Sequence, residues 1–132
     1  MSKTFTTALT LSSTTLFPQT ANVTANLTQV VSGSAGFDLL VVPQTSSKQL
    51  YKAAEADPSS TVYFYAQALS TNPSVLTLAI TGSDGNSSSI VRLRAGDMTY
   101  IPLNATSATL EVNCINAHTA AQNIYVFYGQ RS

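Results

Sequence analysis

The residues best suited to chemistry are one cysteine and one histidine, four positions apart. Cys114 and His118 are each the only residue of their type in the 132-residue chain. A metal site needs three or four His, Cys, Asp or Glu ligands, so this pair alone does not make one. Neither residue lies in the sharp turn that exposes a catalytic nucleophile. We therefore expect no metal, a buried and reduced Cys114 that acts as a small hydrophobe, and a solvated His118.

Six carboxylates are the remaining candidates for acid–base chemistry. They are Asp38, Glu55, Asp57, Asp84, Asp97 and Glu111. Two carboxylates that flank a sugar bond can hydrolyse it. However, Asp57, Asp84 and Asp97 lie in turn sequences, where aspartate bonds the neighbouring backbone. Residues 84–86 resemble part of a calcium loop, but the other acidic ligands of such a loop are absent. We expect no enzymatic activity and no cofactor.

The tyrosines suggest a different kind of chemistry, the binding of carbohydrate. Lectin-like sandwiches stack sugar rings on exposed aromatic side chains. The alternative is that strand tyrosines pair across a sheet with their hydroxyls in water. The chain has no tryptophan, which favours cross-strand pairing and leaves a lectin-like module as the alternative function. The tyrosines are Tyr51, Tyr63, Tyr65, Tyr100, Tyr125 and Tyr128.

Two arginines share one face of a predicted strand. Arg92 and Arg94 alternate with Val91 and Leu93, the pattern of a half-buried strand. They either form a cross-strand salt bridge with Glu111 or anchor a protein interface, where the planar guanidinium is favoured. The interface candidates are Arg92, Arg94, Tyr63, Tyr65, Tyr125 and Phe127.

The composition limits the partners that the chain can have. Charged residues make up 9% of the chain, and six basic side chains balance six acidic ones. Soluble domains usually have about 25% charged residues. Binding of nucleic acid by counterion release needs clustered Lys and Arg, so we expect none. No apolar run approaches the roughly 18 residues of a membrane span, and no signal peptide is visible. We expect protein partners and no membrane.

Short strands separated by turns would hold these side chains. Residues 90–103 are predicted as a hairpin, with a turn at 95–97 and a second strand that stops at Pro102. Residues 61–69 carry no charge on either face, which suits a central strand or one that meets a partner. Residues 37–42 form an apolar run, typical of a strand covered on both faces. The remaining predicted segments are 4–11, 22–31, 75–81, 109–115 and 124–128 as strands, 82–86 as a hairpin loop, and 48–56 as an edge strand or a helical turn.

Nine or ten short strands with turns every 8–12 residues predict an all-β fold, an antiparallel β-sandwich. A jelly roll is the first choice and an immunoglobulin-like sandwich the second. Residues 1–132 form one domain by size, with 1–4 expected to be a mobile N-terminal segment. Within 22–31, the alternation predicts that Val23, Leu27 and Val31 point inward.

The C-terminal part resembles a known group of proteins. A Leu-x-x-Gly-acidic segment, an extended run with a proline and a final strand ending in aromatic-Gly follow one another. These features are Leu93, Gly96, Asp97, Pro102, Tyr125, Phe127, Tyr128 and Gly129. The chain also has low charge and strands rich in Ser, Thr and Ala. In these features it resembles the decoration, or cement, proteins on the outside of tailed-bacteriophage heads.

That resemblance implies a structural protein of the virion, made in the host cytoplasm and located on the capsid surface. Its partner would be the lattice of the major capsid protein, and it would commonly be a homotrimer. The uncharged faces of 61–69 and 124–128 also predict a homo-oligomer, because a sandwich of this size has one interior. We expect residues 1–4 and the polar loop 12–20 to contact the lattice, with little dependence on salt.

Overall fold

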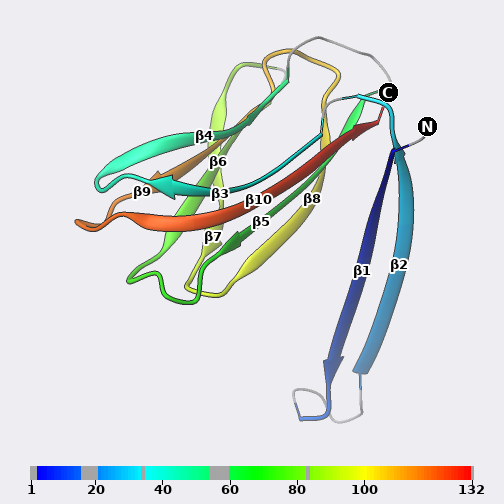
Figure 1. Cartoon of the computed structure of the whole chain (residues 1–132), viewed down its shortest axis with the longest axis horizontal. Coiled ribbons are helices and arrows are strands. Elements are labelled where there is room, and N and C mark those ends of the chain that lie inside the picture. Colours follow the sequence, from blue (N-terminus) through cyan, green and yellow to red (C-terminus); the bar gives the residue numbers. More distant parts are fainter. Residues whose placement is uncertain (1–2, 16–20, 34, 54–59, 83, 132) are drawn as a thin grey trace.

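A computed structural model describes residues 3–15, 21–33, 35–53, 60–82 and 84–131, and these form ten strands and no helix (Figure 1). No helix in the described ranges has the length and apolarity that a membrane crossing requires. The strands are β1 (Lys3–Ser13), β2 (Ala21–Val31), β3 (Ala35–Val42), β4 (Ser46–Lys52), β5 (Thr61–Ala68), β6 (Leu76–Thr81), β7 (Ser87–Leu93), β8 (Met98–Asn104), β9 (Glu111–Asn116) and β10 (Gln122–Arg131).

The last eight strands pair as a nested set. Strand β3 pairs with β10, β4 with β9, β5 with β8 and β6 with β7, all antiparallel. Two further pairings, β10 with β5 and β6 with β9, complete two four-stranded sheets of order β3-β10-β5-β8 and β4-β9-β6-β7. A long hairpin that is folded over and rolled up gives this order, which is that of an eight-stranded jelly roll. The predicted β-sandwich is therefore confirmed in its jelly-roll form.

The core lies between these two sheets and follows the alternation of the sequence. In β5, the side chains of Val62, Phe64, Ala66 and Ala68 are buried. Cys114 of β9 is a free cysteine and is also fully buried, as predicted. Full burial of a side chain such as Val62 or Phe64 stabilises the folded state by about 1.5–3 kcal/mol. The two sheets are thus held together mainly by apolar side chains of their central strands.

The predicted hairpin at 90–103 is wrong, although both of its strands exist. Strand β7 pairs with β6 in one sheet, and β8 pairs with β5 in the other. The connecting turn has Gly96 at φ 86° and is closed by the Arg94 N–H, which donates to Asp97 Oδ2 at 2.9 Å. This turn is an arch between the sheets. Strand β8 also continues past Pro102, which the sheet tolerates because β8 is an edge strand.

The structure decides between the two alternatives for residues 48–56, an edge strand or a helical turn. Residues 46–52 form the edge strand β4. Residues 54–59, which include Glu55 and Asp57, lie outside the described residues. The loop between β6 and β7 is the predicted hairpin, and Gly85 in it has φ 77°. Its N–H donates to the carbonyl of Gly82 at 3.1 Å. The turn residues therefore predicted a hairpin correctly here, where the two flanking strands pair with each other.

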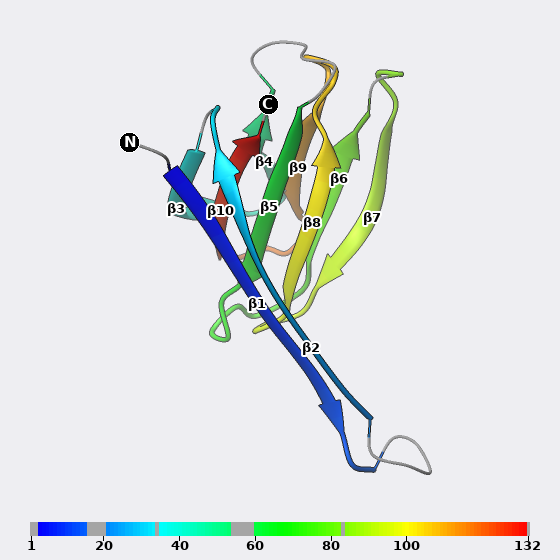
Figure 2. The ribbon, with the colours of Figure 1, turned by 90° about the vertical axis from the view of Figure 1, so that its right-hand side faces the viewer.

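Strands β1 and β2 form a two-stranded arm outside the sandwich (Figures 1 and 2). They pair without interruption from Lys3–Val31 to Ser13–Ala21. Figure 2 shows the arm crossing in front of the β3-β10-β5-β8 sheet and extending past the end of the sandwich. The predicted inward position holds for Val31, which is buried, but is wrong for Val23 and Leu27, which are exposed. Alternation defines the faces of a strand but not whether a core covers them.

Candidate functional site

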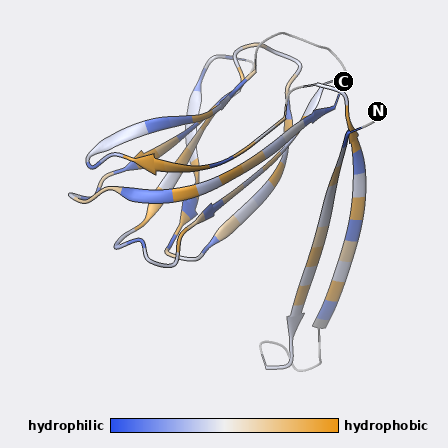
Figure 3. Cartoon of the chain, in the orientation of Figure 1, coloured by the Kyte–Doolittle hydropathy of each residue, from blue (hydrophilic) through white to orange (hydrophobic). Residues whose placement is uncertain are grey.

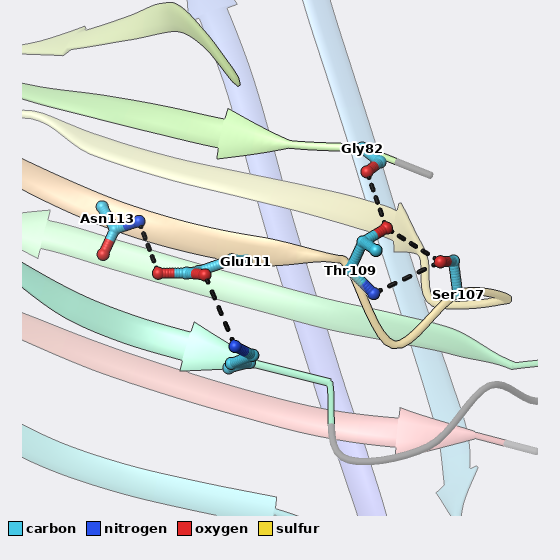
Figure 4. Close-up of polar contacts among 6 residues, drawn as sticks. Gly82, Ser107, Thr109, Glu111 and Asn113 are labelled. Atoms are coloured by element: carbon cyan, nitrogen blue, oxygen red, sulfur yellow. Dashed lines mark hydrogen bonds and ion pairs between the residues drawn. The ribbon is translucent and has the colours of Figure 1, made fainter. Parts of the chain in front are cut away.

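The outer face of the β4-β9-β6-β7 sheet is an ordinary solvated surface. Asn113 donates to Glu111 Oε1 at 2.8 Å, and Thr109 donates to the carbonyl of Gly82 at 2.8 Å (Figure 4). The Lys52 ammonium lies 3.9 Å from Glu111 Oε2, so Glu111 forms its ion pair with Lys52. Of the two alternatives for Arg92 and Arg94, the salt bridge to Glu111 is therefore wrong, and the interface anchor stays a prediction. Exposed pairs of this kind contribute about 0–1 kcal/mol.

The six predicted interface residues do not form one surface. Arg92 lies opposite Thr77 on the β6–β7 pair, and Arg94 follows it in the arch; both are exposed. The four aromatic candidates belong to the other sheet. They are Tyr63, Tyr65, Tyr125 and Phe127. The structure brings the aromatic candidates together and places the two arginines apart from them.

The outer face of the β3-β10-β5-β8 sheet is apolar over its centre, and Arg131 at the end of β10 is the charged residue among its described outward positions. We call the uncharged central part the aromatic face. By alternation and register it consists of Phe37, Leu39, Val41, Tyr63, Tyr65, Gln67, Met98, Tyr100, Pro102, Tyr125 and Phe127. One row crosses all four strands as Phe37, Phe127, Tyr65 and Tyr100. Phe37 is 68% exposed and Met98 is 60% exposed. Residues 37–42 are thus covered on one face only, which corrects the prediction that both faces are buried.

The arm is anchored to the aromatic face at its base. The ring of Phe5 lies edge-on to Phe127, with 4.7 Å between centroids, and 6.1 and 6.2 Å from the rings of Tyr63 and Tyr100. Ring pairs of this kind contribute about 0.5–1.5 kcal/mol beyond their burial. The base is also fixed by Arg131, which donates to Gln29 Oε1 at 2.8 Å. Tyr63 is therefore buried beneath the arm, which limits it to a structural contact within the chain.

Beyond its base, the arm is amphipathic and uncovered. We call the side that carries Phe5 the inner face; apart from Lys3 at the base and Ser13 at the far end, it consists of Phe5, Thr7, Leu9, Leu11, Val23, Ala25, Leu27, Gln29 and Val31. The opposite side is mostly Thr and Asn, and the hydroxyls of Thr6 and Thr28 lie 3.2 Å apart across it. Figure 3 shows the alternation along β2. Leu11 is 59% exposed and Val23 is 60% exposed. An isolated hairpin is marginally stable in water, so this arm has a physical need for a partner.

A cleft of about 300 Å³ separates the inner face of the arm from the aromatic face. It is lined by Phe5, Thr6, Thr7, Ala8, Leu9, Phe37, Tyr65, Met98, Tyr100 and Phe127. The hydroxyls of Thr7 and Tyr100 are shielded from solvent and have no hydrogen-bond partner among the described residues. A buried hydroxyl without a partner costs about 1–3 kcal/mol. Tyr65 donates to Gln67 Oε1 at 2.9 Å, and burial raises the pKa of Tyr65.

The titratable groups singled out from the sequence have structural surroundings. Burial raises the pKa of Cys114 to about 12, so its thiol stays protonated at neutral pH. His118 accepts the Ala120 N–H on Nδ1 at 3.1 Å. Hydrogen bonds from the side chain and backbone of Asn86 lower the pKa of Asp84. Across the described ranges, no three His, Cys, Asp or Glu residues cluster as metal ligands would. The chemistry that the surface offers is apolar contact.

The sequence reasoning missed the most important residues of this surface. Phe5, Phe37 and Met98 were not among the candidates, and neither was the inner face of the arm. The available signal was the alternation of apolar residues with Thr and Asn in 22–28, which marks one apolar face. No protein-family model matches the chain, and no curated protein gives a significant match. The function must therefore be inferred from the arm and the aromatic face.

Proposed function

We propose that this protein is a structural protein of the virion, bound as a homotrimer to the outside of a bacteriophage capsid and stabilising it through protein–protein contacts. The observation that carries the proposal is the amphipathic arm, which extends past the sandwich with its apolar inner face uncovered. A two-stranded arm with an uncovered apolar face is marginally stable in water, so contact with a partner would stabilise it. A protein that bridges neighbours in a lattice uses such an arm to reach from one neighbour to the next.

The charge distribution supports attachment by apolar contact. The arm strands carry one charged residue, Lys3 at the base, and the sheet carries Arg131 where it bonds Gln29 of the arm, while the aromatic face itself carries no charge. Association therefore requires little desolvation of charge. Attachment through uncharged surfaces should also be nearly independent of salt, because salt screens only ionic contacts. A symmetric oligomer on a symmetric lattice makes several such contacts at once, and effective concentration multiplies them.

The fold supports the same role by analogy alone. Jelly rolls occur in viral capsid proteins and in lectins, and a shared fold does not by itself imply a shared function. The second candidate is accordingly a lectin-like module. The observation in its favour is the pair Phe37 and Tyr125, whose rings stack with 6.1 Å between centroids and 10° between planes beside the cleft. Binding to defined sugars on a glycan array, lost in Tyr125→Ala, would favour this candidate.

The test of the virion proposal begins with mass spectrometry of the native source particles. The expected result is that the protein copurifies with capsids in a fixed copy number per major capsid subunit. The protein is then stripped from particles and allowed to rebind across a salt series. Leu11→Ser and Val23→Ser change one rung of the inner face, and Thr10→Ser and Thr24→Ser change the next rung on the outer face as matched controls.

We expect the two inner-face variants to rebind at least tenfold more weakly, while the controls and wild type rebind equally from low to high salt. Equal rebinding by the inner-face variants would remove the arm from the mechanism. Steep loss of wild-type binding with salt would show that the contacts are ionic. A protein absent from the particles would overturn the proposal as a whole.

A further inference from the structure

The distal half of the arm has no surface of its own chain to rest on. Each arm strand has eleven residues and each strand of the facing sheet has seven to ten. At about 3.3 Å per residue, the arm is about 36 Å long and an eight-residue strand about 26 Å. The arm is attached at one end of the sheet, and the far ends of β1 and β2 lie past the other end (Figure 2). Closure onto its own sheet would therefore still leave these far ends uncovered.

The same chain carries a second uncovered apolar surface. Phe5 covers the aromatic face around Tyr63 and Tyr100, but it leaves the β3 side open. There, Phe37 is 68% exposed, and Leu39 and Val41 are exposed as well. This surface and the distal inner face are both uncharged, so they can meet without burying an unpaired charge.

We propose that the distal arm of one chain packs its inner face onto the β3 side of the aromatic face of a second copy. The inference deepens the proposed function, because it names the first partner of the arm and thereby builds the oligomer. One face of a two-stranded arm is about 10 Å wide, so its distal half, about 18 Å long, covers on the order of 180 Å². Each arm-to-face contact is therefore much smaller than the roughly 800 Å² per partner of a standard interface. A closed ring, in which every copy donates one arm and receives another, makes several such contacts at once.

The donating and receiving surfaces are different, so the association is head-to-tail. Head-to-tail interfaces close into rings when the rotation allows, and a ring of three is the homotrimer.

The test uses complementation between two defective variants of the full chain. One variant, Leu11→Ser/Val23→Ser, has a defective arm and an intact aromatic face. The other, Phe37→Ser/Leu39→Ser, has a defective aromatic face and an intact arm. Ile115→Ser, at an exposed apolar position on the opposite sheet, is the matched control. The mass of each protein, 13.9 kDa for one chain, is measured by light scattering over a concentration series from micromolar to millimolar.

We expect wild type and Ile115→Ser to have the mass of an oligomer and each double variant alone to be monomeric. An equimolar mixture of the two double variants should form a 1:1 dimer, because one intact arm then meets one intact face. A dimer that appears only in the mixture also shows that both variants are folded. A monomeric wild type would overturn the inference, as would double variants that stay oligomeric or a mixture that stays monomeric.

These outcomes are separable from the proposed function. A monomeric wild type that needs Leu11 and Val23 to rebind particles would place the arm on the capsid protein and leave the virion role intact. Complementation in solution by a protein that never attaches to particles would support the self-association and reject the virion role.

Discussion

Gly129 of β10 lies directly beneath Val31 of β2, so closely that a Cβ atom at position 129 would stand 2.8 Å from Val31 Cγ2. The same atom would lie 3.3 Å from the ring of Phe5. The absence of a side chain at 129 is what allows the base of the arm to sit on the sheet. The position of the arm therefore depends on one glycine of the last strand.

Gly129→Ala should release the base of the arm while the sandwich stays folded. Overpacking of this kind costs about 1–3 kcal/mol, and the arm can relieve it by lifting from the sheet. Hydrogen exchange should become faster in β1 and β2 but not in β5 or β9. Gly82→Ala is the control, since its Cβ would meet nothing closer than 3.6 Å. Unchanged exchange in the arm would show that the base adapts without lifting.

Asp97 should stabilise the arch that carries the chain from one sheet to the other. Its carboxylate accepts the Arg94 N–H at 2.9 Å, and its own N–H donates to the Arg94 carbonyl. Asp97→Ala should lower the free energy of unfolding by about 1 kcal/mol, the usual contribution of such a bond. Asp97→Asn keeps an acceptor and should retain most of the stability. Denaturant titration measures both variants, and equal losses would show that charge matters rather than the bond.

The sandwich could be predicted because its central strands obey one rule. In β5 and β9, alternate residues are apolar and enter the core, so sequence alone marks both the strand and its inner face. The arch at 94–97 could not be distinguished from a hairpin. Both need a residue at positive φ and a local acceptor, here Gly96 and Asp97, and the difference lies in which distant strands take the two partners.

The candidate site was only partly predictable for a related reason. Alternation in 22–31 correctly separates Val23 and Leu27 from Thr24 and Asn26, but it does not tell a core from open solvent. The apolar run at 37–42 was interpreted as covered on both faces because a short, nearly continuous apolar run is typical of such a strand. Both wrong predictions assumed that an apolar strand face is covered by the chain's own core. They fail at the two faces that the core leaves exposed, and these are the faces for which a partner is proposed.

A buried polar network at one end of the sandwich gives a prediction that sequence reasoning missed. Asn116 and Gln122 flank a polar loop, yet both are buried, and Gln122 donates to Asn116 Oδ1 at 2.7 Å. The Asn116 amide also donates to the carbonyls of Val42 and Ala120. Asn116→Ala should therefore lower the free energy of unfolding by about 2–4 kcal/mol, because buried groups lose their partners.

Asn113→Ala is the matched control for Asn116→Ala. It makes the same change in the same strand, but on the outer face, where Asn113 bonds Glu111. Surface changes of this kind usually stay within about 0.5 kcal/mol. Both variants are measured by urea unfolding. Similar losses at the two positions would show that the network contributes no more than an exposed hydrogen bond.

The last prediction concerns the pH dependence that Cys114 gives to stability. Burial raises the pKa of the folded thiol from its ordinary value near 9 to about 12. The unfolded chain therefore loses this proton first, and the contribution is fully present below pH 9 and is lost as pH rises toward 12. At pH 10 the loss is on the order of 1 kcal/mol. Cys114→Ala should be about 1 kcal/mol less stable than wild type at pH 7, because of the small cavity.

The difference between wild type and Cys114→Ala should vanish or reverse at pH 10, because only wild type has the thiol. Comparison of the two proteins cancels the titration of Tyr and Lys residues, which both contain. A maleimide reagent gives an independent measurement, since it reacts with exposed thiols. It should label native wild type at pH 7 only at the rate of unfolding. Rapid labelling, or a stability difference that is the same at pH 7 and pH 10, would show that the thiol reaches solvent in the folded protein.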